Sequence, residues 1–189
     1  SLALLLLAQA AFSGMVEAAT VDHGLRSESA DEARFVAGFC RDRGIPHAIP
    51  TCAVEGGNIQ DRARSARYAA LDQWAKGRAI AAIATAHHAD DQAETLLMRL
   101  NRGSGLSGLS GIRASTTIPD SDTLLLRPLL SWRRAELAQI VAAAGVAPIH
   151  DPSNDDPRFD RVRMRNALKG ATWIDPAALA RSSAHLAEA

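Results

Sequence analysis

The sequence predicts an α/β fold in which helices wrap a parallel sheet and a small helical extension follows at the C-terminal end. Two observations carry this prediction. Apolar stretches of strand length alternate with stretches of helical length, which is the order found in βαβ units. The segment 79–86, AIAAIATA, is apolar throughout, as in a strand buried on both faces of a parallel sheet. In such sheets, ligands bind at the carboxyl ends of the strands.

The expected elements follow one another regularly along the chain. The predicted helices cover 2–13, 27–43, 58–76, 89–100 and 131–144, and the predicted strands cover 17–21, 47–54 and 79–86. Ser27 and Ser131 are predicted helix N-caps, since a serine hydroxyl can accept a hydrogen bond from a free amide of the first turn. Gly44, Gly77 and Gly145 are predicted to end the helices that precede them.

Three further segments complete this outline. The apolar segment 2–11 is predicted to be a buried helix, because it is too short to cross a membrane and no Lys or Arg precedes it as in a signal peptide. A hairpin is expected around 119–122, and the polar tract 151–165 leads into a final helical stretch. We therefore expect an α/β domain over 1–130, a helical extension over 131–189, and no association with a membrane.

The composition excludes several classes of protein. The 189 residues are 47% hydrophobic and 22% charged, as in an ordinary soluble domain, which argues against a disordered or fibrous chain. The 21 basic residues balance 21 acidic ones, so a uniformly basic nucleic-acid clamp is excluded, whereas a local basic patch is not. Cys40 and Cys52, the only cysteines, cannot form a disulfide framework or a four-cysteine zinc site.

The segment 87–94, HHADDQAE, is the strongest candidate site. It begins at the end of the buried strand and runs into a helix, where His87, Asp91 and Glu94 are spaced to share one face. Two carboxylates there could hold Mg²⁺, bind an ammonium group or accept a proton. The alternative is N-capping of the helix by Asp90 and Asp91. A zinc site is disfavoured, because no third nitrogen or sulfur ligand is evident.

Two other polar segments lie where a nucleotide could bind. Asp22 and His23 follow the first strand, and could contact a ribose hydroxyl or merely satisfy the local backbone. The glycine-rich loop 103–111 could cradle a phosphate with its amides, or serve as a flexible connection, and it matches neither a dinucleotide fingerprint nor a Walker loop.

Arginines form the last group of candidates. Arg64 and Arg67 lie near Tyr68 on a predicted helix, where a guanidinium could bind a phosphate or lie on a solvated face. In the tract 151–165, arginines occupy every second position from 161 to 165, on one side of an extended strand or spread around a helix. With Arg158 and Lys169 they form a basic patch suited to phosphate or RNA backbone, although a salt-bridged surface helix is the alternative.

These segments together resemble one known family over essentially the whole chain. The segments are VDHGLR (21–26), NIQDRARSARYAAL (58–71), ATAHHADDQAETLLMRLNRGSGLSGLSGI (84–112), RPLL (127–130) and DPSNDDPRFDRVRMR (151–165). They resemble the ordered motifs of the tRNA(Ile)-lysidine synthetase family, the bacterial PP-loop ATP pyrophosphatases, and the 84–112 block is the most specific. The resemblance implies the PP-loop fold and a cytoplasmic enzyme. Such an enzyme uses ATP and Mg²⁺ to adenylate carbon 2 of the wobble cytidine in tRNA(Ile) with a CAU anticodon, and L-lysine then displaces AMP.

The resemblance also implies roles for individual residues. Asp91 and Glu94 would hold the lysine ammonium, His87 would lie in the nucleotide site, and Arg67 would stabilise the activated intermediate; these are the predicted catalytic residues. The residues expected at the nucleotide are Ser1, Asp22, His23, Arg102, Gly103 and Ser104. Those expected at the lysine or tRNA are Asp91, Glu94, Arg127, Asn154, Arg161, Arg163 and Arg165. The ligands of Mg²⁺ remain unassigned, and a homodimer is held open as an assembly.

The sequence departs from the family pattern in two places. The signature loop Ser-Gly-Gly-x-Asp-Ser would precede the first helix, so that Ser1 is its expected last residue in a chain truncated at the front. The last motif, usually Arg-Asn-Arg, is Arg161-Val162-Arg163. Two alternatives follow: another PP-loop tRNA-modifying enzyme such as a thiolase, although the two cysteines lack the spacing for sulfur transfer, or a non-catalytic RNA-binding remnant.

Overall fold

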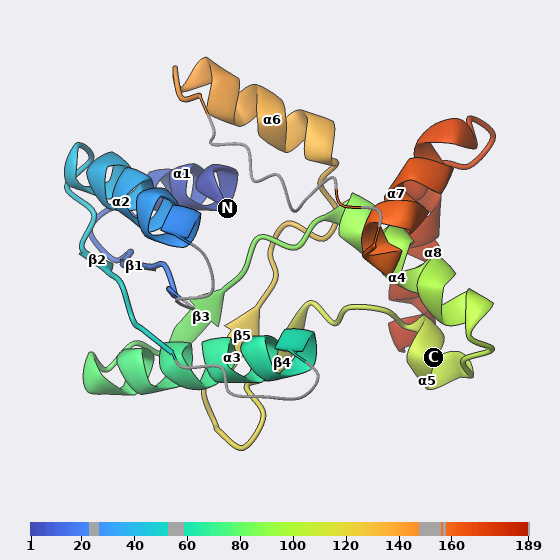
Figure 1. Cartoon of the computed structure of the whole chain (residues 1–189), viewed down its shortest axis with the longest axis horizontal. Helices are drawn as coiled ribbons and strands as arrows, with labels where there is room; N and C mark the ends of the chain where they lie inside the picture. Colours follow the sequence, from blue (N-terminus) through green and yellow to red (C-terminus); the bar gives the residue numbers. More distant parts are fainter. Residues whose placement is uncertain (23–26, 53–58, 148–155, 157, 189) are drawn as a thin grey trace. The chain divides into compact units, whose positions relative to one another are not determined.

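A computed structural model describes residues 1–22, 27–52, 59–147, 156 and 158–188 (Figure 1). The chain divides into two compact units. The sheet unit comprises Leu5–Ile83 and Thr116–Leu126, and the helical unit comprises Ser1–Leu4, Ala84–Ser115 and Arg127–Ala189. Each unit is described by itself below. None of the helices in the described part of the chain is long and apolar enough to cross a membrane.

The sheet unit begins with two short parallel strands and the helices beside them. Strand β1 (Ala18–Ala19) pairs with β2 (His47–Ala48), with Ala18 opposite His47, and a parallel bridge between Asp22 and Thr51 extends this pairing. Helix α1 (Leu2–Ala11) precedes β1, and Gln9 donates a hydrogen bond to the carbonyl of Arg43 at 2.8 Å. Helix α2 (Ser27–Arg41) connects the two strands and packs against β2, as expected of a βαβ unit.

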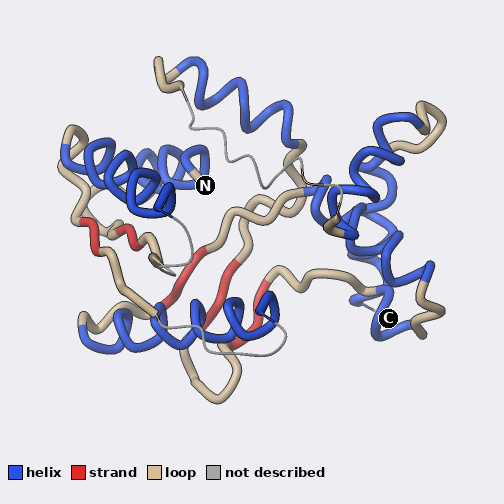
Figure 2. The backbone as a smooth tube through the Cα atoms, in the orientation of Figure 1, coloured by secondary structure: helices blue, strands red, loops and turns tan. Residues whose placement is uncertain are grey.

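The core of the sheet unit lies between α3 (Ile59–Gly77) and a three-stranded sheet. The strand order is β3 (Ala82–Ala84), β5 (Leu124–Leu126) and β4 (Ser115–Thr117), and Figure 2 shows these strands side by side. Strands β4 and β5 form a hairpin, in which the amide of Ile118 donates to the carbonyl of Thr123 at 3.0 Å. The buried residues of this core are Tyr68, Leu71, Ala75, Ile83, Ile118 and Leu125.

The helical unit is built around α4 (Ala89–Asn101). Helices α7 (Asp160–Gly170) and α8 (Pro176–Glu188) pack against α4, and the short helix α5 (Leu106–Leu109) packs against both α4 and α8. Helix α6 (Arg134–Ala143) follows the loop after β5. The apolar face of α4 is covered by this packing, because Ala89, Ala93 and Leu96 are all buried.

The structure confirms the α/β class, the parallel pairing after α1 and the hairpin around 119–122. The described strands are shorter than predicted, with residues 53 and 54 of the predicted 47–54 strand outside the described residues, and the expected start of one helix is wrong. The helix expected from Ser131 begins at Arg134 with Arg133 as its N-cap, because the Glu136 carboxylate accepts from the amide of Arg133 at 2.7 Å. The helix expected over 89–100 is confirmed over Ala89–Asn101, and His87 lies before its first residue. The proposed division at 130 stays a prediction.

Candidate functional site

The first turn of α4 is closed by a reciprocal pair of hydrogen bonds. The amide of His88 donates to Asp91 Oδ2 at 3.0 Å, and the amide of Asp91 donates to His88 Nδ1 at 3.3 Å. This capping box satisfies two amides that a helix N-terminus otherwise leaves without partners. It also places His87 before the helix, where its Nδ1 lies 3.0 Å from Thr85 Oγ1. The spacing predicts that His87 shares a helical face with Asp91 and Glu94. This prediction is wrong, because His87 lies before the helix.

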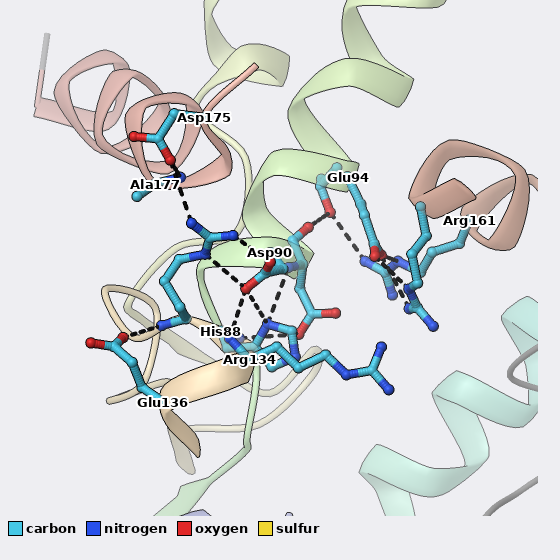
Figure 3. Close-up of polar contacts among 12 residues, drawn as sticks. His88, Asp90, Glu94, Arg134, Glu136, Arg161, Asp175 and Ala177 are labelled. Atoms are coloured by element: carbon cyan, nitrogen blue, oxygen red, sulfur yellow. Dashed lines mark hydrogen bonds and ion pairs between the residues drawn. The ribbon is translucent and has the colours of Figure 1, made fainter. Parts of the chain in front are cut away.

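Asp90 has a structural task that differs from that of Asp91. Its carboxylate accepts from Arg133 Nη2 at 3.2 Å and from the amide of Arg134 at 2.8 Å, and Arg133 also reaches Asp175 at 3.4 Å (Figure 3). Burial raises the pKa of Asp90, but the hydrogen bonds from Arg133 and Arg134 together outweigh this effect and hold its pKa below the ordinary value. Asp90 thus ties the start of α4 to the start of α6, and Arg133 extends this link to Asp175, next to the start of α8.

Glu94 is a buried carboxylate held by two arginines of α7. Only 2% of Glu94 is exposed. Arg165 Nε donates to Glu94 Oε1 at 2.7 Å and Arg165 Nη2 lies 3.4 Å from Oε2, while Arg161 Nε lies 3.3 Å from Oε2 (Figure 3). A buried carboxylate needs such compensation, because an isolated charge in a protein interior is strongly destabilising.

The conformation of α7 decides between the two arrangements considered for the alternating arginines. Because 160–170 is helical, Arg161 and Arg165 are one turn apart and both contact Glu94. Arg163 points elsewhere and pairs with Asp160, which also binds Arg102 Nη2 at 3.3 Å. The arginines are therefore spread around a helix, and each of the three has an acidic partner.

The glycine-rich loop after α4 is fixed by side chains of the helical unit. Gln92 accepts from the amide of Ile112 at 2.6 Å and donates to its carbonyl at 2.9 Å, and Arg99 donates to the carbonyls of Gly108 and Gly111. Gly111 has a φ of +67°, and a Cβ there would collide with Ser183 Oγ and lie 2.8 Å from Gln92 Cδ. A glycine is required at this position for both reasons.

The amides at the start of that loop are already engaged. The amide of Gly103 donates to the carbonyl of Leu100 at 3.0 Å, and the amide of Ser104 donates to the carbonyl of Arg99 at 3.0 Å. These bonds close the C-terminal end of α4. A contribution of Gly103 and Ser104 to nucleotide binding would therefore come from atoms other than these two amides.

Arg127 is a buried guanidinium that contacts main chain. It is 7% exposed, its Nη1 donates to the carbonyl of Arg113 at 2.7 Å, and its own amide donates to the carbonyl of Ala114 at 2.8 Å. Its Nε has no hydrogen-bond partner among the residues that the structure describes. These contacts explain how the RPLL segment is attached to residues 113–114.

In the sheet unit, Asp22, Cys52 and Arg67 form an electrostatic group beyond the ends of β1 and β2. The amide of Asp22 donates to the carbonyl of Pro50 at 2.9 Å, and the amide of Cys52 donates to the carbonyl of Asp22 at 3.1 Å. Burial and the Asp22 carboxylate raise the pKa of Cys52, and Arg67 partly opposes them. Such a thiol is a poor nucleophile at neutral pH. Asp22 thus lies at the carboxyl end of a parallel strand pair, as predicted.

Three predicted site residues remain to be placed. His23 and Asn154 lie outside the described residues. Ser1 precedes α1 and lies within electrostatic range of Asp91. In the described ranges, no group of three or more His, Cys, Asp or Glu could hold a metal ion, so no Mg²⁺ ligand is assigned.

Three residues that organise this region were missed by the sequence analysis. Gln92 binds the backbone at Ile112, Arg99 binds the carbonyls of the glycine-rich loop, and Arg133 neutralises Asp90. Their partners lie between 9 and 43 residues away in the chain. No local spacing rule detects such pairs; only a polar Gln within an otherwise apolar helix face hints at one of them.

The chain is similar to several bacterial proteins that carry the name tRNA(Ile)-lysidine synthase. It is 53% identical to that of Novosphingobium aromaticivorans, over all of this chain and 59% of the relative. It is 52% identical to that of Zymomonas mobilis, over 93% of this chain and 54% of the relative. For Ruegeria pomeroyi the identity is 47%, over 90% and 41%. The chain spans about half the length of these curated relatives.

The fold has a counterpart of known structure and a matching family model. The solved U34-tRNA thiolase NcsA from Methanococcus maripaludis, with its [4Fe-4S] cluster, superimposes with a TM-score of 0.77 at 18% identity, over all of this chain and 68% of that chain. At this identity the match concerns the fold alone. The model of the PP-loop domain matches residues 1–171. Because that match covers most of the sequence and agrees with the fold, the chain belongs to the PP-loop domain family.

Proposed function

We propose that the protein containing this chain ligates L-lysine to carbon 2 of the wobble cytidine of a CAU-anticodon tRNA(Ile), with ATP as the activating substrate. The observation that carries the proposal is the identity of 47–53% with relatives named tRNA(Ile)-lysidine synthase. These relatives carry the name of the family that the motifs predicted. The match to the PP-loop domain supports binding of ATP.

Asp91 and Glu94 are proposed to receive the lysine side chain. They lie three residues apart at the start of α4, and Asp91 is held in place by the capping box with His88. A carboxylate can orient an ammonium group and then accept its proton, which the amine must lose before its lone pair can attack carbon 2. The amine then forms the new C–N bond as AMP leaves with the oxygen of that carbon.

Arginines and the strand-end aspartate are proposed to serve the nucleotide and the RNA. Asp22 and His23 are the proposed nucleotide contacts of the sheet unit, where Arg67 is the proposed catalytic residue that stabilises the activated intermediate or its phosphates. In the helical unit, His87 is proposed to be catalytic within the nucleotide site, and the other proposed nucleotide contacts are Arg102, Gly103, Ser104 and Ser1. Guanidinium groups suit this task because they bind phosphate oxygens through two hydrogen bonds. The proposed contacts to lysine or tRNA, besides the two acidic residues, are Arg127, Asn154, Arg161, Arg163 and Arg165.

Mg²⁺ bound together with ATP would supply positive charge to its phosphates. Magnesium at nucleotide sites needs only one or two carboxylates besides the phosphates, so the acidic residues present are compatible with it. A cytoplasmic location and a homodimer are proposed on the family resemblance alone, as is the division into a catalytic domain over 1–130 and an extension over 131–189.

The proposal is tested by incubating the protein, expressed from its complete reading frame, with ATP, Mg²⁺, radiolabelled lysine and a tRNA(Ile) transcript. A transcript with uridine in place of the wobble cytidine is the control. We expect incorporation of lysine into the first transcript only, with release of AMP and pyrophosphate.

Two other outcomes would contradict the proposal. Release of pyrophosphate without lysine incorporation would retain an adenylating enzyme and point to a different nucleophile, as in a thiolase. If neither product forms while the transcript still binds, the chain is a non-catalytic RNA-binding module.

A further inference from the structure

The Glu94 carboxylate is almost fully occupied by α7. A carboxylate offers about four lone-pair positions to donors. Arg165 takes one on Oε1 at 2.7 Å and approaches Oε2 at 3.4 Å, and Arg161 approaches Oε2 at 3.3 Å. With 2% of Glu94 exposed, a substrate ammonium cannot reach this carboxylate while both arginines remain in place.

We propose that Arg165 is a positioning residue that occupies the lysine-ammonium position at Glu94, and that lysine binding displaces its guanidinium. This inference rests on the proposed function, because it takes Glu94 as part of the lysine site. It adds a competition between an internal cation and the substrate, and so couples lysine binding to the position of the Arg165 side chain on α7.

The exchange avoids an uncompensated buried charge, because one cation replaces another. A buried carboxylate that loses its cation is strongly destabilised. When an ammonium replaces a guanidinium, one positive charge replaces another, and Glu94 is compensated in both states. The Arg165 guanidinium therefore stabilises the site when no lysine is bound. It also weakens lysine binding, because its contact with Glu94 must be broken first.

Arg165, rather than Arg161, covers the position that an ammonium group would take on Glu94. Arg165 contacts both carboxylate oxygens, whereas Arg161 contacts one. Arg161 Nη2 also donates to Thr95 Oγ1 at 3.1 Å, and Thr95 itself donates to the carbonyl of Asp91 at 2.8 Å. If Arg165 leaves, Arg161 still supplies part of the compensation.

The test is the Michaelis constant for lysine in lysidine formation, measured on the full-length protein at saturating ATP and tRNA. In Arg165→Gln, a neutral amide replaces the charged donor, so we expect the KM for lysine to fall roughly tenfold, because a hydrogen bond to a charged group is worth about 1.5 kcal/mol or more. Arg165→Lys keeps the charge without the two-pronged contact, and its KM should lie between those of Arg165→Gln and the wild type.

Arg181→Gln is the matched control. Arg181 is an exposed arginine of α8 in a loose ion pair with Asp175 at 3.8 Å, and its variant should leave the KM for lysine unchanged. Circular dichroism confirms that each variant is folded. If Arg165→Gln fails to fold, Arg165→Lys alone decides, since the competition predicts a lower KM for it too.

The sign of the change separates this inference from a structural role. An arginine that only braces α7 against α4 would, on removal, raise the KM for lysine or lower kcat at an unchanged KM, and either result would overturn the competition. Should the wild type incorporate no lysine at all, the proposed function fails instead. Normal incorporation with a KM that does not fall refutes only the inference drawn here.

Discussion

At the scale of the residue, neighbouring acidic side chains in the HHADDQAE segment have three separate tasks. Asp90 is bound by Arg133 and Arg134, Asp91 closes the first turn of α4, and Glu94 is buried between arginines of α7. Capping by Asp91 could be predicted from the sequence, because a capping box is a local pattern. The partners of Glu94 could not, since Arg165 is 71 residues away and only the packing of α7 on α4 brings it near.

Gly111 provides a test of the way the glycine-rich loop is fixed. Replacement by alanine should destabilise the protein by about 2–4 kcal/mol, since it combines an unfavourable positive φ with a collision against Ser183 and Gln92. Gly103→Ala is the control, because Gly103 has nearly the same φ, +68°, with nothing within 4 Å of the added methyl group. Urea denaturation measures the free energy of unfolding of both variants. Equal losses of stability would show that the collision with Ser183 and Gln92 adds no cost beyond that of the positive φ.

At the scale of the element, the helices were predicted more closely than the strands. Helix α3 was expected over 58–76 and observed over Ile59–Gly77, because glycine ends and amphipathic spacing are local signals. Strand β2 was expected over 47–54, but among the described residues, which reach Cys52, its ladder covers His47–Ala48 with a bridge at Thr51. Strand length depends on the neighbouring strand, which the sequence of one strand does not specify.

The attachment of the β4–β5 hairpin to α3 provides a second test. Asp72 on α3 accepts hydrogen bonds from Ser121 Oγ at 2.6 Å and from Thr123, and pairs with Lys76 at 2.8 Å. The bond from Lys76, followed by those from Ser121 and Thr123, lowers the pKa of Asp72 from 3.8 to about 2. Because the folded pKa is depressed, this stabilisation is present above pH 4 and is lost as the pH falls toward 2.

Asp72→Asn should therefore be less stable than the wild type at pH 7, and the difference should shrink as the pH falls from 4 to 2. Denaturant titrations of both proteins at a series of pH values measure it. A difference that stays constant over this range would show that the Asp72 charge does not hold the hairpin.

At the scale of the whole molecule, the chemistry-bearing residues come from both compact units. Asp22 and Arg67 belong to the sheet unit, whereas Asp91, Glu94 and the arginines of α7 belong to the helical unit. A net charge of zero conceals a basic helix: α7 carries Arg161, Arg163, Arg165 and Lys169 against one acidic residue. The α/β class and the family were predictable from alternating elements and ordered motifs, whereas the division into these units arises from packing between distant segments.

The most direct test of the central claim measures adenylation and lysine transfer separately in the variant Asp91→Asn. Asparagine keeps an oxygen that can accept from the amide of His88, so the capping box can persist while the charge is removed. Glu136→Gln is the matched control, because Glu136 has the same capping position on α6 and no proposed role in the reaction.

Pyrophosphate release and lysine incorporation are measured on the same full-length preparations with ATP and the CAU transcript. We predict that Asp91→Asn releases pyrophosphate at close to the wild-type rate but incorporates lysine at least about a hundredfold more slowly, as expected for loss of a proton-accepting carboxylate, while Glu136→Gln matches the wild type in both. An unchanged yield of lysidine in Asp91→Asn would contradict the account.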